Sequence, residues 1–553
     1  MTSRVQNRFL NPLLKSYLFF GIAYALLLAA ALAPYYRGGA VILGGEGDYV
    51  LDYGLHLKKY AHAWYAAYGA GMPNYSPCAT GLNIALPALL EKAGAPLPAV
   101  NFAVVFGIFF FPFLGVFLIA RDRRLPPLWA WALGFFYVAN PMMLNYLASL
   151  NQWNVFSVSA MPFFFWLIQR LYARDGALFF GFGIASAAVS FVFTNYPMMI
   201  VLLLCGAFAL AVTVLEREKR APARVFLRKG VVCAGGFLVF NAWWLLGLPA
   251  IVAAAQQIYS RAFAATWLKT VVSDSGAVTE KIVLFTLGVT DQPLYSMLSY
   301  WTHLPGAPFV LSIPFLVSLQ ALWRQEGRRP AAAISMAALL ACVFFVKGSA
   351  PPLGFFFRFL FVHVPFFYIF KTPTEKFGLF FVFLFTLFLL RFGPWKNAPS
   401  RLDLWARRAF GGYAAFLLVP FLCVGIIPDY TIPHIGLATR RYVEPADFTA
   451  LRRYLSRDAG DGRVFALPGL GNYQICFMSA AGRYYTGFDP LLTNTARSVL
   501  PMDAAQYFLY DSLDAPAYPD LLRLYGVTTL VLRPELIPWF GYVGGHDGGV
   551  LDR

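Results

Sequence analysis

The sequence predicts a polytopic α-helical membrane protein with a small extracytoplasmic α/β domain at its C-terminal end. Three observations support this class: the mean hydropathy is +0.60, 59% of the residues are hydrophobic, and only 13% are charged. Apolar stretches recur that are long enough, at about 18 to 22 residues, to cross roughly 30 Å of hydrocarbon as helices. We count about eleven, at 16–36, 99–120, 127–148, 153–169, 177–194, 198–215, 231–254, 306–323, 331–347, 377–391 and 410–427.

The net charge of +17 follows the membrane topology. Every second connection between apolar stretches is basic, and together these connections hold 22 Lys and Arg against 6 Asp and Glu; they are 1–15, 121–126, 170–176, 216–230, 324–330 and 391–409. The positive-inside rule places them in the cytoplasm, so the N-terminus is predicted to be cytoplasmic and the other connections extracytoplasmic. The expected location is the plasma (inner) membrane, and nucleic acid is not an expected partner.

Two domains are expected. Residues 1–428 form the transmembrane domain, and 37–98 is its first extracytoplasmic loop, with a helix lying along the membrane interface. Residues 429–553 form the α/β domain, in which "PADFTALRRYLSRD" predicts a helix and "GRVFALPG" and "VTTLVL" predict strands. A re-entrant or interfacial hairpin is expected over 347–376. A disulfide between the two outward-facing cysteines, Cys78 and Cys476, stays open.

The first outer loop carries the densest group of titratable residues, in "GGEGDYVLDYGLHLKKYAHAWYAAYGAGMPN". If 48–56 is helical, Asp48, Asp52 and His56 fall four residues apart and share one face. A carboxylate beside an apolar, aromatic surface can have a raised pKa and act as a general base. The alternative is an ordinary helix start in which Asp48 is the N-cap. A divalent metal on Asp52 and His56 is a further alternative, but it lacks an evident third ligand, and no cofactor is expected.

Basic residues stand among aromatic ones in two later outer segments. Arg358, Lys371 and Lys376 could clamp a phosphate, and Arg261 is a further candidate. The alternative is snorkelling toward lipid headgroups, with a local salt bridge between Glu375 and Lys376. The apolar stretches themselves contain few charges, whereas ion-coupled transporters usually need ionisable residues within the membrane. The pattern therefore favours chemistry at the outer surface over transport.

These features resemble the GT-C superfamily of polytopic glycosyltransferases, and most closely its arabinofuranosyltransferase-like members and the YfhO-like membrane proteins. The resemblance rests on the "GD" of "EGDYVLDYG" early in the first outer loop and on "IFKTPTEKFGLFF" before a late helix. It implies that Asp48 is the catalytic base, with Asp52 as second choice. An extra Thr-Glu between Pro373 and Lys376 departs from the family pattern and puts the alignment of the basic residues in doubt.

The resemblance also implies the reaction: inverting transfer of a sugar from a polyprenyl-phosphate donor to an extracytoplasmic glycan, lipid or protein. Lys371, Lys376, Arg358 or Arg261 would hold the donor phosphate. His56, Trp64 and Tyr68 would line the sugar pocket, and the prenyl tail would lie in a groove between spans, with membrane lipids as further partners. Two other readings remain open: a lipid-linked glycan transporter or flippase, and a non-catalytic membrane assembly factor.

Overall fold

The structure is a computed structural model that describes most of the chain between residues 12 and 532. The described ranges are 12–43, 51–60, 64–65, 72–73, 75–148, 150, 152–193, 195–218, 222–247, 284–285, 305–323, 330–364, 367–370, 372–395, 400–419, 421–422, 427, 430–432, 436–439, 441–457, 462–467, 475–478, 484–487, 509 and 512–532. They form two compact units that are described separately below. The first unit contains 1–32, 106–148 and 153–426, and the second contains 33–105, 149–152 and 427–553.

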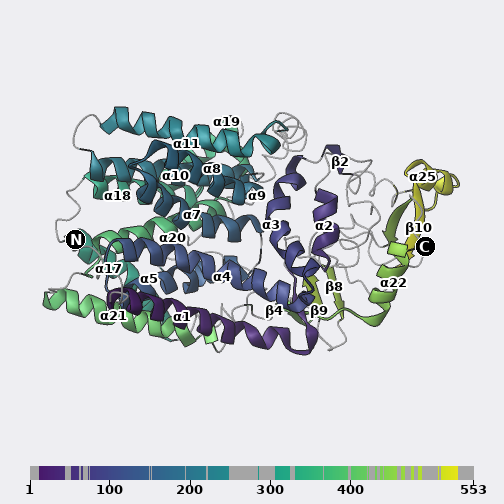
Figure 1. Cartoon of the computed structure of the whole chain (residues 1–553), viewed down its shortest axis with the longest axis horizontal. Coiled ribbons are helices and arrows are strands. Elements are labelled where there is room, and N and C mark those ends of the chain that lie inside the picture. The colour runs from purple at the N-terminus through teal and green to yellow at the C-terminus, as the bar shows by residue number, and fades with distance from the viewer. Residues whose placement is uncertain are drawn as a thin grey trace, which may run out of the picture. The chain divides into compact units, whose positions relative to one another are not determined.

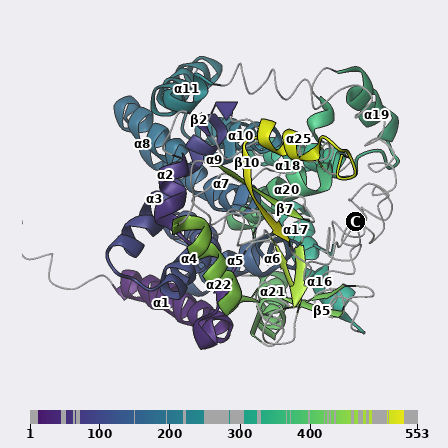
Figure 2. The same ribbon diagram turned by 90° about the vertical axis from the view of Figure 1, so that its right-hand side faces the viewer.

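The first unit is helical, and many of its helices run roughly side by side (Figure 1). Figure 2 shows several of them nearly end-on. The elements are α1 (Pro12–Leu32), α4 (Leu97–Asp122, from residue 106), α5 (Pro127–Ala139), α6 (Pro141–Ala148), α7 (Gln152–Leu171, from residue 153), α8 (Asp175–Ala188), α9 (Ser190–Phe193), α10 (Tyr196–Arg217), α11 (Pro222–Leu245), α16 (Ala307–Leu311), α17 (Ile313–Trp323), α18 (Pro330–Val346), α19 (Gly354–His363), η4 (Phe367–Phe370), α20 (Pro373–Phe392) and α21 (Arg401–Val419).

Each of the eleven expected apolar stretches overlaps at least one of these helices. Within the described residues, four segments are long and apolar enough to cross a membrane: Lys15–Gly39, Leu97–Asp122, Tyr196–Arg217 and Pro222–Leu245. The expected stretch at 127–148 is divided into α5 and α6, because Pro141 cannot donate the backbone hydrogen bond that would continue α5. The count of about eleven spans therefore stays a prediction.

Aromatic side chains pack α1 against α4. Tyr24 is fully buried, its ring stacks on Phe113 with centroids 3.8 Å apart, and its hydroxyl donates a hydrogen bond to the backbone oxygen of Phe109 at 3.0 Å. Burying a tyrosine hydroxyl costs free energy unless the hydroxyl finds a hydrogen-bond partner, and this one does. The N-terminal helix is thus packed into the helical unit.

Helices α8 and α11 approach closely at two glycines. A Cβ atom on Gly236 would lie 2.3 Å from the backbone oxygen of Phe179, and one on Gly183 would lie 2.8 Å from the backbone oxygen of Gly236. Neither distance is compatible with a side chain, so these positions need glycine. Small residues at helix crossings let backbones approach closely, and membrane helices commonly pack in this way.

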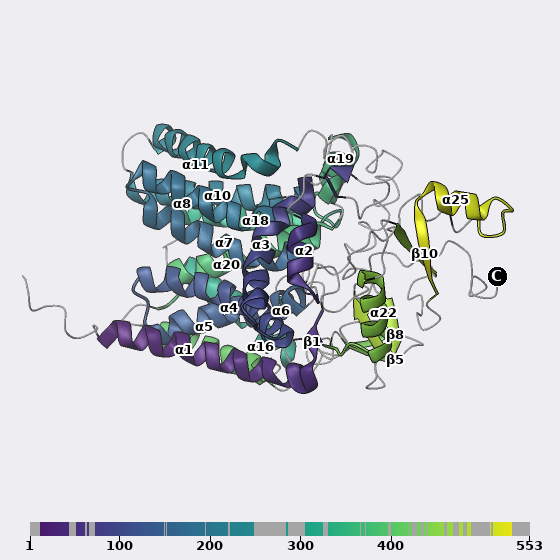
Figure 3. The same ribbon diagram turned by 45° about the vertical axis from the view of Figure 1, so that its right-hand side comes forward.

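The second unit combines the loop after the first apolar helix with the C-terminal part of the chain (Figure 3). From the loop come η1 (Ala33–Gly39), β1 (Val41–Ile42), α2 (Tyr53–Tyr60), β2 (Trp64–Tyr65), β3 (Met72–Pro73), α3 (Tyr75–Lys92) and the start of α4. From the C-terminal part come β4 (Tyr430–Ile432), β5 (Gly436–Thr439), β6 (Arg441–Tyr442), α22 (Ala446–Arg457), β7 (Arg463–Leu467), β8 (Ile475–Met478), β9 (Tyr484–Gly487), α25 (Tyr518–Leu524) and β10 (Val527–Leu532).

The predicted C-terminal elements form where the sequence indicated, as α22, β7 and β10. Strands β7 and β10 pair in parallel, and a separate four-stranded sheet has the order β4-β5-β9-β8. Strand β1 of the loop pairs antiparallel with β6, with Val41 opposite Tyr442 and Ile42 opposite Arg441. The pairing of β1 with β6 could not be expected from the sequence, because a two-residue strand gives no readable pattern, and the boundary at 428 stays a prediction.

Candidate functional site

The structure describes only some of the predicted site residues. Asp52, His56, Arg358 and Lys376 are described with their side chains, and Trp64 is described as part of β2 without its side chain. Asp48, Tyr68, Arg261 and Lys371 lie outside the described residues, and so do the side chains of Cys78 and Cys476.

Asp52 forms the N-cap of α2. Its Oδ1 accepts a hydrogen bond from the backbone N–H of Leu55 at 2.7 Å, and its backbone oxygen accepts one from His56 at 3.2 Å. Aspartate is well suited to this position because the first N–H groups of a helix have no partner within it. Helix α2 therefore begins at Tyr53, later than the helix over 48–56 that would have put Asp48 and His56 on one face.

Glu91, in the last turn of α3, reaches the same helix start. Its Oε2 accepts a hydrogen bond from the backbone N–H of Gly54 at 3.0 Å. Burial raises the pKa of the Glu91 carboxyl above its ordinary value, and the negative charge of Asp52 raises it further. The hydrogen bonds from Gly54 and Tyr53 and the positive charge of Arg452 oppose that rise. Glu91 thus favours its neutral form more than an ordinary glutamate does.

The two carboxylates converge above Gly54. A Cβ atom on Gly54 would lie 3.6 Å from Oδ1 of Asp52 and 3.9 Å from Oε2 of Glu91, so both carboxylates lie at van der Waals distance from this one position. Pairs of carboxyl groups in unequal environments are the arrangement that separates an acid from a base. Sequence reasoning missed Glu91, since it lies 39 positions beyond Asp52 (91 − 52) near the end of another helix.

His56 is buried at 3% exposure, and its Nδ1 lies 3.3 Å from the backbone oxygen of Asp52. The imidazole is therefore packed against its own helix turn. Within the described part of the chain, no group of three or more His, Cys, Asp and Glu side chains is arranged to hold a metal ion.

A buried core holds α2 on α3 and on the start of α4. Tyr53 packs with Ile84, Ala88 and Val100, and all four are nearly inaccessible. This core fixes the direction in which the start of α2, and with it Asp52, is presented.

Asn101, at the start of α4, holds the segment that precedes Asp48. Its side chain exchanges two hydrogen bonds of 2.9 Å with the backbone of Ile42, as a neighbouring strand would, and accepts a third from the hydroxyl of Tyr36 at 3.0 Å. Asn101 is fully buried, so its two bonds to Ile42 are protected from water, whereas the bond from Tyr36 is partly buried. The chain on both sides of 44–50 is thereby fixed, at Ile42 by Asn101 and at Gly54 by Glu91.

The basic candidates of the first unit differ in environment. Lys376 is buried, and its ammonium lies 2.8 Å from Glu375, which also accepts hydrogen bonds from Asn154 and Thr372. The expected local salt bridge is thus present. Arg358 is exposed on α19, next to Phe359, which is 52% exposed. This setting agrees with an arginine that reaches toward lipid headgroups.

Solved structures of one enzyme share this fold. A cryo-EM structure of arabinofuranosyltransferase AftD from mycobacteria matches with a TM-score of 0.57 and 13% identity, over 97% of this chain and 36% of that chain. Two structures of a mutant of AftD match at 12% identity with TM-scores of 0.57 and 0.53, over 96% and 94% of this chain and 37% of theirs. The present chain thus spans little more than a third of the length of these neighbours.

No protein-family model matches the sequence, and no curated protein matches it in a sequence search. At this level of identity the structural match shows the fold alone. The chain shares its fold with arabinofuranosyltransferase AftD, and this match together with its long apolar helices indicates a membrane protein. The YfhO-like part of the sequence resemblance stays a prediction.

Proposed function

We propose that the protein is an inverting membrane glycosyltransferase that moves a sugar from a polyprenyl-phosphate donor to an extracytoplasmic glycan, lipid or protein. The observation that carries the proposal is a fold shared with an arabinofuranosyltransferase over 97% of the chain. The first loop supports it, because Asp52 and Glu91 converge at the start of α2, close in sequence to the "GD" at Asp48. Fold alone does not define an activity, so the proposal depends on this site.

Asp48 acts as the general base in this proposal. Its carboxylate takes the proton of an acceptor hydroxyl while the hydroxyl oxygen attacks the anomeric carbon of the donor sugar. The bond between that carbon and the phosphate oxygen breaks, and polyprenyl phosphate leaves with the electron pair. Asp52 is the second choice for the base, because the N-cap bond to Leu55 engages one of its two oxygens, and the other has no hydrogen-bond partner among the described residues.

Negative charge develops on the phosphate as it leaves. Positively charged side chains that stabilise this charge commonly account for a large part of the lowering of the activation barrier. Lys371 and Arg261 remain candidates for this role, together with the exposed Arg358. Lys376 is the weakest candidate, because Glu375 already pairs with its ammonium at 2.8 Å. Trp64 and Tyr68 are proposed to line the sugar pocket, while the buried His56 supports α2 from within the loop. A good leaving group of this kind requires no metal cofactor.

The test is transfer by the purified full chain in lipid, with a panel of polyprenyl-phosphate sugars as donors. Asp48→Asn and Asp52→Asn are compared with Asp520→Asn, which removes a carboxylate that is 76% exposed and pairs with Arg523. We expect Asp48→Asn to abolish transfer with donor binding intact, and Asp520→Asn to retain full activity. General bases contribute about 10²- to 10⁴-fold in rate, which sets the size of the loss.

Other outcomes would redirect the proposal. Loss of transfer only in Asp52→Asn would move the base to that residue. Wild-type protein that binds no donor and transfers no sugar would reject the enzyme, and would bring forward the lipid-linked glycan transporter and the non-catalytic assembly factor.

A further inference from the structure

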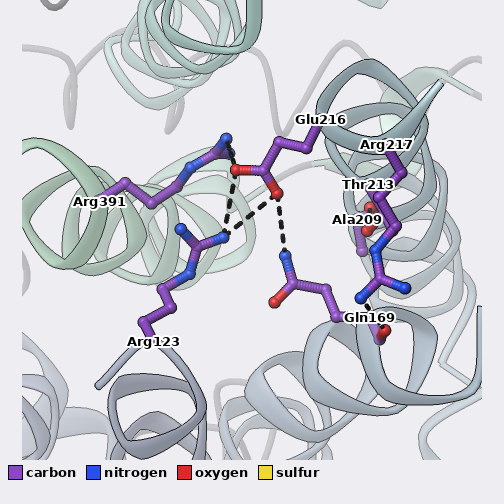
Figure 4. Close-up of polar contacts among 7 residues, drawn as sticks. All are labelled: Arg123, Gln169, Ala209, Thr213, Glu216, Arg217 and Arg391. Atoms are coloured by element: carbon purple, nitrogen blue, oxygen red, sulfur yellow. Dashed lines mark hydrogen bonds and ion pairs between the residues drawn. The ribbon is translucent and has the colours of Figure 1, made fainter. Parts of the chain in front are cut away.

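A second polar cluster lies at one end of the helices of the first unit, where α7, α10, α20 and the turn after α4 contribute side chains (Figure 4). Glu216, in the last turn of α10, is its centre. Arg123, just past α4, donates hydrogen bonds to both carboxylate oxygens of Glu216 at 3.4 and 3.3 Å. Arg391, in the last turn of α20, donates to Oε1, and Gln169 of α7 donates to Oε2 at 3.5 Å.

The cluster has more cationic groups than carboxylates. Two guanidinium groups share the single carboxylate of Glu216, which leaves one positive charge unmatched. The neighbouring Arg217 donates instead to the backbone oxygen of Gln169 at 2.8 Å. Asp122 is already engaged by Arg121 at 3.0 Å, so it does not balance the pair.

Two of the guanidinium N–H groups also lack an acceptor among the described residues. The side chain of Arg391 is only 4% exposed, and its Nη1 has no hydrogen-bond partner there. The Nε of Arg123 is buried and unpartnered in the same way. A buried donor on a charged group that finds no acceptor is costly, so these atoms indicate an anionic group that completes the cluster.

The missing acceptor has a definable chemistry. Guanidinium groups bind phosphate oxygens through pairs of parallel hydrogen bonds, and a phosphate offers several oxygens to two arginines at once. Helices α4 and α10, which meet here by their last turns, are two of the four described segments long and apolar enough to cross a membrane. A helix that crosses the bilayer ends near the level of the lipid phosphates. Arg123 and Glu216 are 23% and 32% exposed, so the cluster reaches the surface.

We propose that Arg123 and Arg391 bind the phosphate group of an anionic membrane phospholipid, in competition with Glu216. The bound phosphate accepts from the unpartnered guanidinium N–H groups and matches the excess positive charge. It thereby ties the ends of α4, α10 and α20 together. This site shares no residue with the proposed sugar-transfer site, and its test does not depend on that activity.

The experiment is native mass spectrometry of the purified full chain with equal amounts of phosphatidylglycerol and phosphatidylcholine. Both lipids carry a phosphate, but only phosphatidylglycerol is net anionic. We expect wild-type protein to retain phosphatidylglycerol preferentially, and Arg123→Gln and Arg391→Gln to lower that retention by about tenfold, since charge-assisted bonds to phosphate are lost. Arg228→Gln is the matched control, because its side chain is 63% exposed and it removes the same charge. It should leave retention unchanged.

Glu216→Gln separates binding from stability, since it removes the competing carboxylate and leaves both arginines in place. Retention of phosphatidylglycerol should then rise. If Arg391→Gln does not fold, the more exposed Arg123 and the Glu216 variant still decide the question. Equal retention of both lipids by wild type, or equal phosphatidylglycerol retention by wild type and all the variants, would overturn the proposal.

A parallel titration with inorganic phosphate identifies the source of the phosphate group. If inorganic phosphate displaces phosphatidylglycerol only at concentrations far above that of the lipid, the result supports the phospholipid as the bound group. Binding of inorganic phosphate that depends on Arg123 and Arg391, without preferential retention of phosphatidylglycerol, would overturn the lipid assignment and give the same anion site to a soluble phosphate compound.

Discussion

The carboxylate of Glu91 accepts the backbone N–H of Gly54 at 3.0 Å, and so joins the end of α3 to the start of α2. Two acidic residues that are distant in sequence, Glu91 and Asp52, therefore serve one helix start. Such a position suits anionic side chains, since the helix dipole places partial positive charge there. The pKa of the Glu91 carboxyl is still raised above its ordinary value, because the effect of its burial outweighs these favourable contacts. This raised pKa has a measurable consequence for stability.

We predict that Glu91 makes the protein less stable as pH rises. Below the ordinary carboxyl pKa, Glu91 is protonated in both folded and unfolded chains and has no effect. Between that value and its raised pKa in the folded protein, the unfolded chain gives up its proton more readily, so the free energy of unfolding falls. Glu91→Gln removes this dependence while keeping an acceptor for Gly54. The measurement is the thermal unfolding midpoint of both proteins between pH 4 and 8.

The difference between the two proteins isolates Glu91 from all other titrations. The charge of Asp52 raises the pKa of Glu91 and the charge of Arg452 lowers it. In an Arg452→Gln background, the difference in pH dependence between the protein with Glu91 and its Glu91→Gln variant should therefore be larger. Two curves that stay parallel across the whole range would show that the pKa of Glu91 is not raised.

Asn101→Ala tests whether the hydrogen bonds of Asn101 fix the segment that precedes Asp48. The substitution leaves the backbone N–H and oxygen of Ile42 and the hydroxyl of Tyr36 without this partner. Each buried polar group left unpaired costs about 1 to 3 kcal/mol, so the free energy of unfolding should fall by at least that amount. Denaturant titration in mixed micelles measures it, and transfer activity should fall as well.

Asn83→Ala is the matched control, because the buried Nδ2 of Asn83 has no hydrogen-bond partner among the described residues. Its removal should leave stability nearly unchanged. Equal losses in the two variants would mean that the three bonds of Asn101 contribute nothing specific.

Long apolar runs made the helices predictable from the sequence. Their length and composition alone indicate helices such as α4 and α10, and the amphipathic pattern of 445–458 indicates α22. The polar sites were harder to predict. Asp52 stood out because it lies in a dense acidic loop, whereas Glu91 and Asn101 act through contacts that no local pattern encodes. The pairing of β1 with β6 joins residues about 400 positions apart, beyond the reach of any periodicity.

Gly236→Ala should destabilise the crossing of α8 and α11. The new Cβ would meet the backbone oxygen of Phe179 at 2.3 Å, and backbone cannot rotate away as a side chain can. Overpacking of this kind typically costs about 1 to 3 kcal/mol. Gly412→Ala in α21 is the control, because nothing lies within 4 Å of its added Cβ and alanine is the better helix former. Thermal unfolding should show a loss for Gly236→Ala and no loss for Gly412→Ala, and two equal losses would contradict the close approach.

Variants of Glu375 and Lys376 can show whether Lys376 has a structural role or binds the donor phosphate. The side chains are 20% and 10% exposed, and their charged atoms lie 2.8 Å apart. Replacing one partner of a buried ion pair leaves the other charge unmatched. The free energy of unfolding then falls by about 3 kcal/mol or more. Lys376→Met and Glu375→Gln should each destabilise strongly, whereas the double variant should recover most of the loss, as a double-mutant cycle in denaturant would show. If the double variant also transfers sugar at the wild-type rate, Lys376 is structural. A double variant that is stable but has lost donor affinity would instead show that Lys376 binds the donor phosphate.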